Sequence, residues 1–274
     1  MGVLQEMMSY AFFSRAIIVG VLVSLCASLL GVTLVLKRYS MIGDGLSHVG
    51  FGALAVASAL HMEPLYVTIP VVVIAAFFLL RISENSKIKG DAAIALISSS
   101  ALAIGVVTAS VNGTNTDLSN YLFGSILAVS KSDQIFSIVL SIIVILIYVL
   151  FYHRVFAITF DENFAKATGL NTEMYNIVIA LLTAITIVLG MRLMGTLLIS
   201  SLIIFPSLTS MRVFKRFSQV VISSACISVI CFVLGMVFSY LYELPSGASV
   251  VIANLGALIL FSIIAFIGSK IKKK

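Results

Sequence analysis

Charged residues are scarce in this chain, since only 10% of its 274 residues are Asp, Glu, Lys or Arg. Hydrophobic residues make up 61% of the chain and the mean hydropathy is +1.18, far above the range of ordinary soluble domains. No loop between the apolar runs is long enough to hold a catalytic domain outside a membrane. The composition therefore excludes a soluble enzyme and predicts a protein that crosses the lipid bilayer several times.

Motifs for several kinds of chemistry are also missing. No GxxxxGK[ST] pattern occurs, so the chain does not bind ATP through a P-loop, and no HExxH pattern marks a metalloprotease. The three cysteines, Cys26, Cys226 and Cys231, lie in apolar runs without metal-finger spacing and are interpreted as small buried hydrophobes. An intramembrane enzyme remains an alternative, but no nucleophile–base pair supports it.

The apolar runs are long enough to span about 30 Å of hydrocarbon as helices. We therefore expect an all-α membrane bundle of eight to nine spans that forms a single transmembrane domain over residues 1–274. The candidate helices cover residues 12–36, 42–60, 64–81, 92–111, 134–152, 174–191, 193–211, 219–241 and 249–269.

Basic residues are distributed unequally between alternate loops. All of the 17 lysines and arginines except Arg15, Lys131 and Arg192 fall in one set of loops and in the C-terminal tail. Basic residues concentrate on the cytoplasmic side, so that set predicts an N-terminus outside and a C-terminus inside. The basic tail 270–274 lacks interleaved aromatics and is interpreted as an inner anchor, with no nucleic acid as partner.

The stretch MIGDGLSHVGFG, residues 41–52, places two polar side chains in a membrane span, where a charge is costly. Asp44 lies roughly 9 Å deeper than Arg38 along a helix, and His48 follows one turn later on the same face. A carboxylate and an imidazole suit Zn²⁺, Mn²⁺ or Fe²⁺, but two ligands are too few for a tight site, and a symmetric dimer would double them. The glycines at 43, 45, 50 and 52 allow neighbouring helices to approach closely. The alternative is a local Asp–His hydrogen bond in a packed bundle.

A second informative stretch, FDENFAKATGL, occupies residues 160–170 of a predicted cytoplasmic loop. Asp161 is expected to cap a short helix over 162–168, and Gly169 to end it in the left-handed conformation. Phe160, Phe164 and Ala165 are expected to form an apolar stripe, with Glu162 and Lys166 outside. Such a helix suits docking into a groove of another protein, or alternatively resting on lipid.

With MGTLLISSLIIFPSLTSM at 194–211 and YELPSGASVVI at 242–252, these stretches resemble the membrane permease of ABC importers for divalent transition metals, nearly end to end. Gly43, Gly45, Gly195, Pro206, Pro245 and Gly247 are the structural positions of these motifs. Pro206 is expected to kink its span.

The resemblance implies a transport subunit that is not itself an enzyme and binds no cofactor, in a bacterial cytoplasmic membrane. Its implied partners are a second permease copy or close paralogue, two cytoplasmic ATPase subunits that use ATP, and an extracellular metal-binding protein. It implies Asp44 and His48 as pathway ligands for the transported ion, with Zn²⁺ slightly favoured over Mn²⁺. The residues that it implies for ATPase coupling are Phe160, Asp161, Glu162, Phe164, Ala165 and Gly169.

Two rival transport functions remain. A permease for metal chelates would need a wide cavity poor in ligands. A proton-coupled secondary transporter would use the Asp44–His48 pair without an ATPase. The docking helix and the lack of a detectable inverted repeat argue against the second rival.

Overall fold

The computed structural model describes residues 11–85, 90–112 and 131–271, and every regular element in these ranges is a helix. Two of these helices are short: α8 (Tyr152–Phe160) and α9 (Glu162–Ala167). The long ones are α2 (Ala11–Leu36), α3 (Ile42–Ala59), α4 (Pro64–Asn85), α5 (Gly90–Val111), α7 (Lys131–Leu150), α10 (Thr172–Met194), α11 (Thr196–Val213), α12 (Phe217–Tyr242) and α13 (Ser246–Ile271). Each of the predicted ranges has its helix, displaced at the ends by a few residues, so the all-α membrane bundle is confirmed.

Seven of these helices, all except α3, α4 and the two short ones, are long and apolar enough to cross a membrane. The apolar part of α4 is shorter and covers Leu65–Leu79. Helix α3 carries Asp44 and His48 together with several glycines, which lower its hydropathy. One of the two long helices that do not qualify as ordinary spans is therefore the helix that holds the candidate site.

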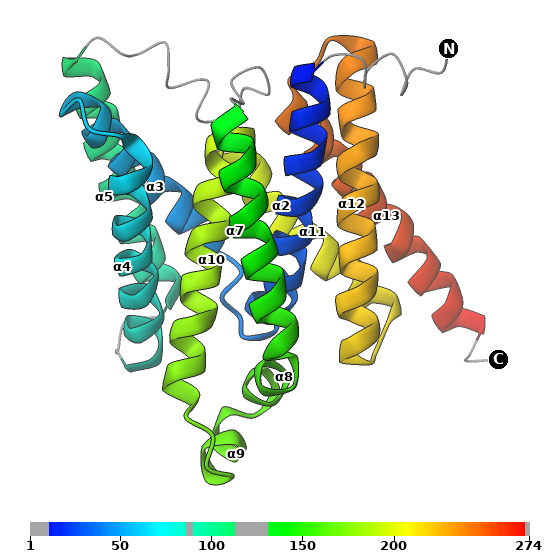
Figure 1. Cartoon of the computed structure of the whole chain (residues 1–274). Coiled ribbons are helices and arrows are strands. Elements are labelled where there is room, and N and C mark those ends of the chain that lie inside the picture. Colours follow the sequence, from blue (N-terminus) through cyan, green and yellow to red (C-terminus); the bar gives the residue numbers. More distant parts are fainter. Residues whose placement is uncertain (1–10, 86–89, 113–130, 272–274) are drawn as a thin grey trace.

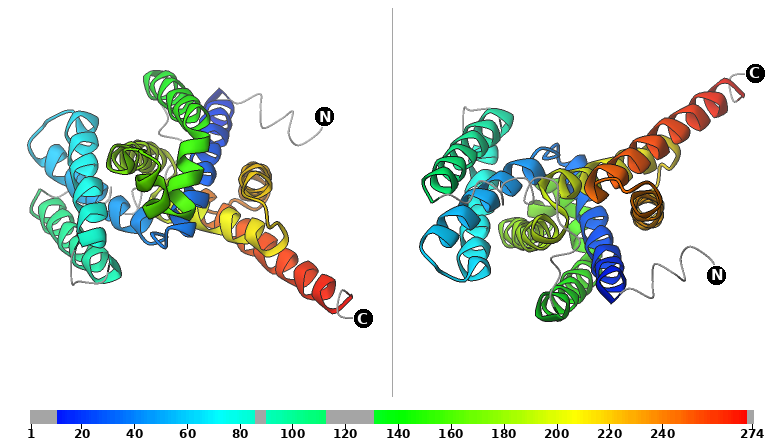
Figure 2. Two further views of the ribbon diagram at one scale, coloured as in Figure 1. Left: turned by 90° about the horizontal axis from the view of Figure 1, so that it is seen from below. Right: turned by 90° about the horizontal axis from the view of Figure 1, so that it is seen from above.

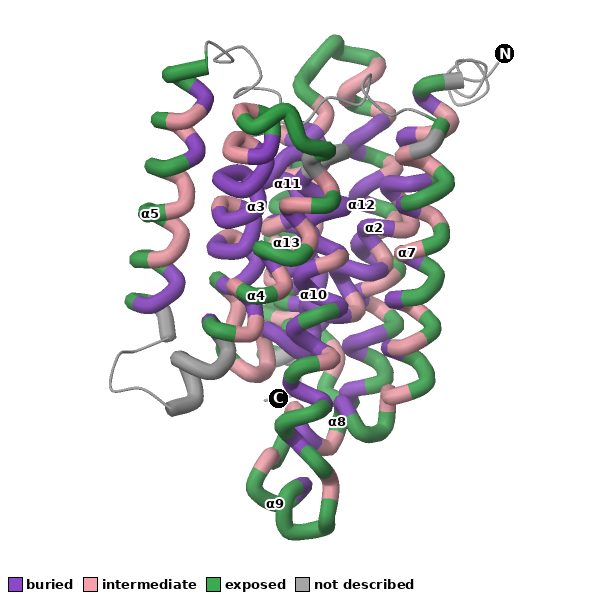
Figure 3. The backbone as a smooth tube through the Cα atoms, turned by 60° about the vertical axis from the view of Figure 1, so that its left-hand side comes forward, coloured by how far each residue is buried: buried purple, intermediate pink, exposed green. Residues whose placement is uncertain are grey.

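Burial separates inner helices from outer ones. Within their apolar windows, 72% of α10 and 67% of α2 are buried, against 22% of α5 and 11% of α13. Helix α2 packs against α7, α10, α11 and α12, whereas α3 packs between α4, α5 and α11. Figure 2 shows α13 projecting away from the bundle, and Figure 3 shows the buried residues concentrated in its middle. The buried helices α2 and α10 therefore form the inner part of the bundle, which supports α3 and α11.

The connections alternate between two ends of the bundle, as the predicted spans require. In Figure 1 the α3–α4 and α12–α13 connections lie at the upper end, whereas α8, α9 and the α11–α12 connection lie at the lower end. The basic residues Arg154, Lys166 and Lys215 belong to these lower segments. Lys87, Lys89 and the residues 272–274, which the sequence assigns to the same side, lie outside the described residues.

Two tight joints set the positions of α3 and α11. Arg38, just after α2, has a left-handed φ of 63°, and the Tyr39 N–H donates to the carbonyl of Leu34 at 2.8 Å. Gly195 joins α10 to α11 with φ 85° and ψ 162°, a combination that is essentially restricted to glycine. Helix α11 continues through the buried Pro206, so the predicted proline lies inside this helix.

Candidate functional site

Asp44 and His48 lie in the first two turns of α3 and face the same way, as their spacing predicts. The carboxylate oxygen Oδ2 of Asp44 lies 3.6 Å from Nε2 of His48, and the two side chains keep 43% and 21% of their surface exposed. This separation is too long for a good hydrogen bond. The other ring nitrogen of His48, Nδ1, is buried and has no hydrogen-bond partner among the described residues. The pair therefore does not satisfy itself in the way that a purely structural Asp–His contact would.

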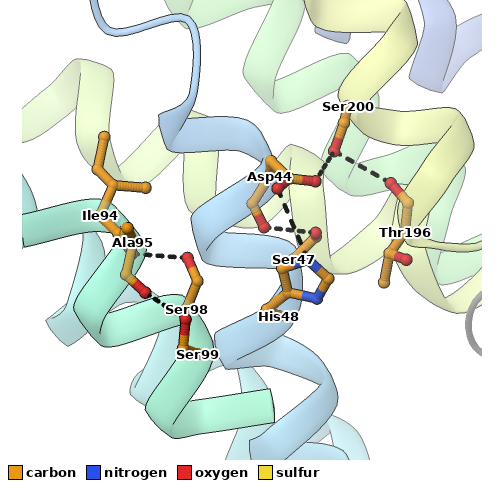
Figure 4. Close-up of polar contacts among 9 residues, drawn as sticks. All are labelled: Asp44, Ser47, His48, Ile94, Ala95, Ser98, Ser99, Thr196 and Ser200. Atoms are coloured by element: carbon orange, nitrogen blue, oxygen red, sulfur yellow. Dashed lines mark hydrogen bonds and ion pairs between the residues drawn. The ribbon is translucent and has the colours of Figure 1, made fainter. Parts of the chain in front are cut away.

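Helix α11 supplies a third polar group to the Asp44–His48 pair. The hydroxyl of Ser200 lies 3.3 Å from Oδ1 of Asp44 and 3.1 Å from the carbonyl of Thr196, one turn earlier in α11. The hydroxyl of Ser47 donates to the backbone carbonyl of Asp44 at 2.7 Å. Figure 4 shows the Asp44 carboxylate lying between Ser200 on one side and His48 on the other.

A cavity of about 280 Å³ opens beside the pair, between α3 and α5. On the α5 side the hydroxyls of Ser98 and Ser99 donate to the carbonyls of Ile94 and Ala95 in their own helix, which leaves their oxygen lone pairs available. The lining residues are Met41, Asp44, His48, Ile94, Ala95, Ser98, Ser99 and Leu102. The cavity thus offers one carboxylate, one imidazole and hydroxyl oxygens, a donor set that can hold a divalent cation weakly.

Glycines bring the walls of this cavity together. A Cβ atom on Gly52 would lie 2.6 Å from the backbone oxygen of Ala101 in α5, and one on Gly45 would lie 2.6 Å from the Ile94 side chain. On the other side of α3, a Cβ on Gly43 would lie 2.9 Å from Ile203 of α11. The prediction that glycines in this stretch permit close helix approach is therefore confirmed.

Ser98, Ser99 and Ser200 were not among the residues predicted for the site. Serine triplet 98–100 stands inside an apolar run, and Ser200 follows the Gly195 motif by about one helical turn. Such hydroxyls usually satisfy themselves on their own helix, so only the packing of α5 and α11 against α3 identifies these residues. Within the described ranges, no group of three or more His, Cys, Asp and Glu side chains gathers anywhere.

The predicted structural residues Pro245 and Gly247 lie at the α12–α13 connection, at the opposite end of the bundle from α9. Glu243 there has a left-handed φ of 52°, and the Ser249 hydroxyl donates to the Pro245 carbonyl at 3.0 Å. These contacts show a tight turn between two spans. Of the predicted structural positions, Gly43, Gly45 and Gly195 are the ones that help to build the Asp44–His48 surroundings.

The short helix at the lower end forms as the sequence predicts. Oδ1 of Asp161 accepts a hydrogen bond from the Phe164 N–H at 2.9 Å, and helix α9 runs over Glu162–Ala167. Gly169 follows with a left-handed φ of 85°. Both predicted ends of the helix are therefore confirmed, and Figure 1 shows α9 protruding furthest from the bundle.

The predicted faces of this helix are partly wrong. Phe164 is 65% exposed, whereas Ala165 is 1% exposed and packs with Ile158 and Tyr175, so the two residues do not share one exposed stripe. Phe160 belongs to the end of α8 and contacts Phe217. Glu162 does not point outward but pairs with Lys37 at 3.3 Å. Ala165 and Glu162 face the bundle because they make the contacts that anchor this short helix, which leaves Phe164 and Lys166 on its exposed side.

Comparison with known proteins places these features in one family. Residues 9–266 match the ABC 3 transport family. The chain is 30% identical over 249 residues to the manganese transport system membrane protein MntC of Listeria monocytogenes, with 91% of this chain and 89% of that protein covered. It is 31% identical over 241 residues to the high-affinity zinc uptake system membrane protein ZnuB of Haemophilus influenzae, covering 87% and 92% respectively.

The fold agrees with a solved structure, PsaBC from Streptococcus pneumoniae in complex with Fab, at a TM-score of 0.85 and 27% identity, over 94% of each chain. The resemblance drawn from the sequence motifs is thus confirmed over nearly the whole chain. The chain belongs to the ABC 3 transport family and is a multi-pass membrane permease subunit of an ABC transporter, without an enzymatic activity of its own.

Proposed function

We propose that this permease imports a divalent transition metal ion, Mn²⁺ or Zn²⁺, across a bacterial cytoplasmic membrane, and that the ion passes through the Asp44–His48 pair. The observation that carries the proposal is the state of that pair. It lies in a membrane helix beside an open cavity, with its two groups 3.6 Å apart and Nδ1 of His48 without a partner in the described structure. Such groups keep coordination capacity for a passing cation.

The weakness of the site supports transport over storage. Conduction requires that an ion bind well enough to enter and weakly enough to leave. One carboxylate, one imidazole and a few hydroxyls meet that requirement. A second permease copy facing this one would contribute another Asp44 and His48, which would complete a four-ligand coordination for the moment of transit. We therefore infer a dimer, either of this chain or with a close paralogue.

Helix α9 supports a link to ATP hydrolysis in partner subunits. Phe164 and Phe160 remain 65% and 59% exposed at the lower end of the bundle, where the basic segments lie. Aromatic side chains held on a capped helix suit a hydrophobic groove in a cytoplasmic ATPase, and one such subunit would dock on each permease copy. On the opposite face, an extracellular metal-binding protein would deliver the ion.

The proposed cycle follows from these positions. The binding protein releases its ion to the Asp44–His48 pairs of the two copies. ATP binding and hydrolysis in the ATPases then move α9, and the spans rock so that the site opens first to the outside and then to the inside. Asp44, Ser200 and His48 hold the ion during that change.

The identity of the ion depends on the donor set. Hard oxygen donors favour Mn²⁺, whereas imidazole favours Zn²⁺. The sequence favours zinc slightly, while the hydroxyls of Ser98, Ser99 and Ser200 around one carboxylate favour manganese. Competition between the two ions for uptake, in cells carrying only this system, measures the preference directly.

Uptake of radioactive Mn²⁺ and Zn²⁺ tests the site. Asp44→Ala and His48→Ala should each abolish uptake while the ATPase subunits still co-purify. Asp133→Ala and His153→Ala are matched controls in α7 and α8, and both should leave uptake unchanged. Normal uptake by the Asp44 and His48 variants would refute the pathway, and it is also the result expected for a permease of metal chelates.

Association with the ATPase separates the ABC mechanism from proton-coupled transport. Phe164→Asp should release the ATPase and stop uptake, because it places a charge in the docking surface. Met62→Asp is the control for ATPase binding and should leave it unchanged, since Met62 is 52% exposed at the opposite end of the bundle. Uptake that survives ATP depletion but stops with a protonophore would establish the secondary transporter.

A further inference from the structure

Three polar side chains from three different helical regions meet at the lower end of the bundle and form what we name the Lys37–Glu162–Asn176 cluster. Nζ of Lys37 lies 3.3 Å from Oε2 of Glu162 and donates to Oδ1 of Asn176 at 2.6 Å. Nδ2 of Asn176 donates to Oε1 of Glu162 at 3.0 Å. The three contacts close a ring in which each carboxylate oxygen has its own donor.

The cluster is well shielded. The side chain of Lys37 is 10% exposed, that of Glu162 is 30% exposed, and Asn176 is 8% exposed as a residue. A shielded, hydrogen-bonded ion pair holds its geometry more firmly than an exposed pair, because loss of either partner leaves a charge without compensation. Surface ion pairs such as those formed by exposed lysines contribute little by comparison.

The cluster joins α9 to the two helices that lead to the candidate site. Lys37 directly follows α2, whose continuation is α3 with Asp44 and His48. Asn176 lies in the second turn of α10, whose continuation beyond Gly195 is α11 with Ser200. Glu162 is the first residue of α9. The Glu162 carboxylate therefore contacts both helix pairs, α2–α3 through Lys37 and α10–α11 through Asn176. The second helices of the two pairs, α3 and α11, meet where Ser200 contacts the Asp44 carboxylate.

Several backbone hydrogen bonds brace the short path from Lys37 to Asp44. The N–H groups of Arg38 and Tyr39 donate back to α2 at 3.1 and 2.8 Å, and that of Ile42 donates to Tyr39 at 3.0 Å. The N–H of Gly45 then donates to Met41 at 3.0 Å. A turn tied in this way transmits displacement better than a loose loop of the same length.

A second contact keeps α9 from moving independently of the bundle. Ala165 packs against Ile158 and Tyr175, and the hydroxyl of Tyr175 accepts a hydrogen bond from Arg154 at 2.6 Å. Helix α9 is thus fixed to α8 and α10 on one side and to Lys37 on the other. Displacement of α9 must either carry these helices along or break the cluster.

We propose that the Lys37–Glu162–Asn176 cluster is the positioning element that couples movement of α9 to the Asp44 site. The proposal rests on the proposed function, because it takes α9 as the docking site of the ATPase. The cluster does not touch the ion. It holds the ends of α2 and α10 to α9, so that one push reaches α3 and α11 together and changes the separation of Asp44, His48 and Ser200.

The test uses the complete transporter, this permease with its ATPase subunits and binding protein, reconstituted in liposomes. Mn²⁺ or Zn²⁺ uptake and ATP hydrolysis are measured together, which gives the number of ions imported per ATP. Glu162→Gln and Lys37→Met should retain ATPase binding and hydrolysis but lower that ratio about tenfold, within the usual range of coupling between sites. The double variant should lose no more than either single one, since both remove the same link.

Controls distinguish coupling from general damage. Glu173→Gln and Lys215→Met alter exposed residues near the same end and should keep the wild-type ratio. Lys37→Arg should preserve most of it, because the positive charge and its donors remain. If Lys37→Met does not fold, two other variants test the same cluster: Glu162→Gln, which is nearly isosteric, and Asn176→Ala.

The outcomes separate the two proposals. A wild-type ratio in both Glu162→Gln and Asn176→Ala would overturn the coupling role while leaving the proposed function intact. An equal loss in Glu173→Gln would also overturn it. Failure of the wild-type permease to bind an ATPase or to import either ion would instead refute the proposed function, and the coupling role with it.

Discussion

Two polar groups of the same kind, each built on one carboxylate, sit in very different states in this molecule. In the Lys37–Glu162–Asn176 cluster both carboxylate oxygens are engaged, at 3.3 and 3.0 Å, and the cation is 10% exposed. In the Asp44–His48 pair the two groups are 3.6 Å apart and Ser200 reaches the other carboxylate oxygen at 3.3 Å, the aspartate is 43% exposed, and a ring nitrogen of His48 has no partner among the described residues. The first group is complete and the second is open.

The difference indicates what each group contributes. A closed polar network contributes rigidity and a defined geometry, and it loses both when any member is removed. An open pair in a membrane helix contributes little to stability, and its donor atoms remain available to a ligand. Substitutions should therefore differ in this respect: those in the cluster should lower stability as well as coupling, whereas those in the pair should abolish uptake with little change in stability.

The largest expected effect is on transport. Asp44→Ala should lower uptake of Mn²⁺ or Zn²⁺ by at least about 100-fold, since removing a direct ligand costs more than the 10–100-fold typical of residues behind the ligands. The unfolding midpoint in detergent micelles should change little, because the removed side chain is 43% exposed and loosely held. Uptake assays and unfolding curves on the same preparation measure both quantities. A large loss of stability would break the contrast between the two groups.

The converse substitution is Lys37→Met. It should lower the free energy of unfolding by about 2–3 kcal/mol, less than the roughly 3–5 kcal/mol for breaking a fully buried pair, because Glu162 keeps 30% of its surface exposed. Denaturant titration in mixed micelles measures this loss. Lys215→Met, on an exposed side chain at the same end, should stay within about 0.5 kcal/mol of the wild type. Equal stability of the two variants would mean that the cluster is not a closed structural element.

Much of this architecture was predictable because membrane insertion imposes simple rules. Apolar run length fixed the helices to within a few residues, and the i, i+4 spacing fixed the common face of Asp44 and His48. Asp161 and Gly169 predict the ends of α9, since helix caps and left-handed glycines depend on local chemistry. Local sequence rules and the lengths of the apolar runs are therefore enough to predict most of the helices.

The contributions that arrive from distant parts of the chain were not predictable. Ser200 reaches Asp44 across 156 positions of sequence, and Lys37 reaches Glu162 across 125. The local pattern of this short helix predicts Glu162 on its outer face, because it contains no information about neighbouring helices. Packing between α2, α9 and α10 overrides that local pattern, and no periodicity in one segment records it.

Gly195 lies between the two groups, on the path from Asn176 to Ser200. Gly195→Ala should lower the free energy of unfolding by about 1–3 kcal/mol, because its φ of 85° and ψ of 162° lie in a region almost closed to other residues. The strain should also shift α11 and weaken uptake. Gly256→Ala, in the middle of α13 where a Cβ meets nothing within 4 Å, is the matched control; it should leave uptake unchanged and should not lower stability, since alanine is the better helix former. The measurements are unfolding in micelles and uptake, and a neutral Gly195→Ala would show that α11 does not depend on this joint.

The smallest expected effect belongs to Ser200→Ala. Its hydroxyl lies 3.3 Å from Asp44, at the long end of hydrogen-bonding distances, so its removal should change stability by no more than about 1 kcal/mol. If Ser200 holds the aspartate for the ion, the concentration of Mn²⁺ or Zn²⁺ at half-maximal uptake should rise about fivefold, the equivalent of about 1 kcal/mol. Ser201→Ala is the control, since in the described part of the chain the Ser201 hydroxyl donates within α11, to the Leu198 carbonyl at 2.8 Å. A rise for Ser200→Ala alone would show that α11 helps the Asp44–His48 pair to hold the ion. Equal behaviour of the two variants would show that only the α3 residues of this site do so.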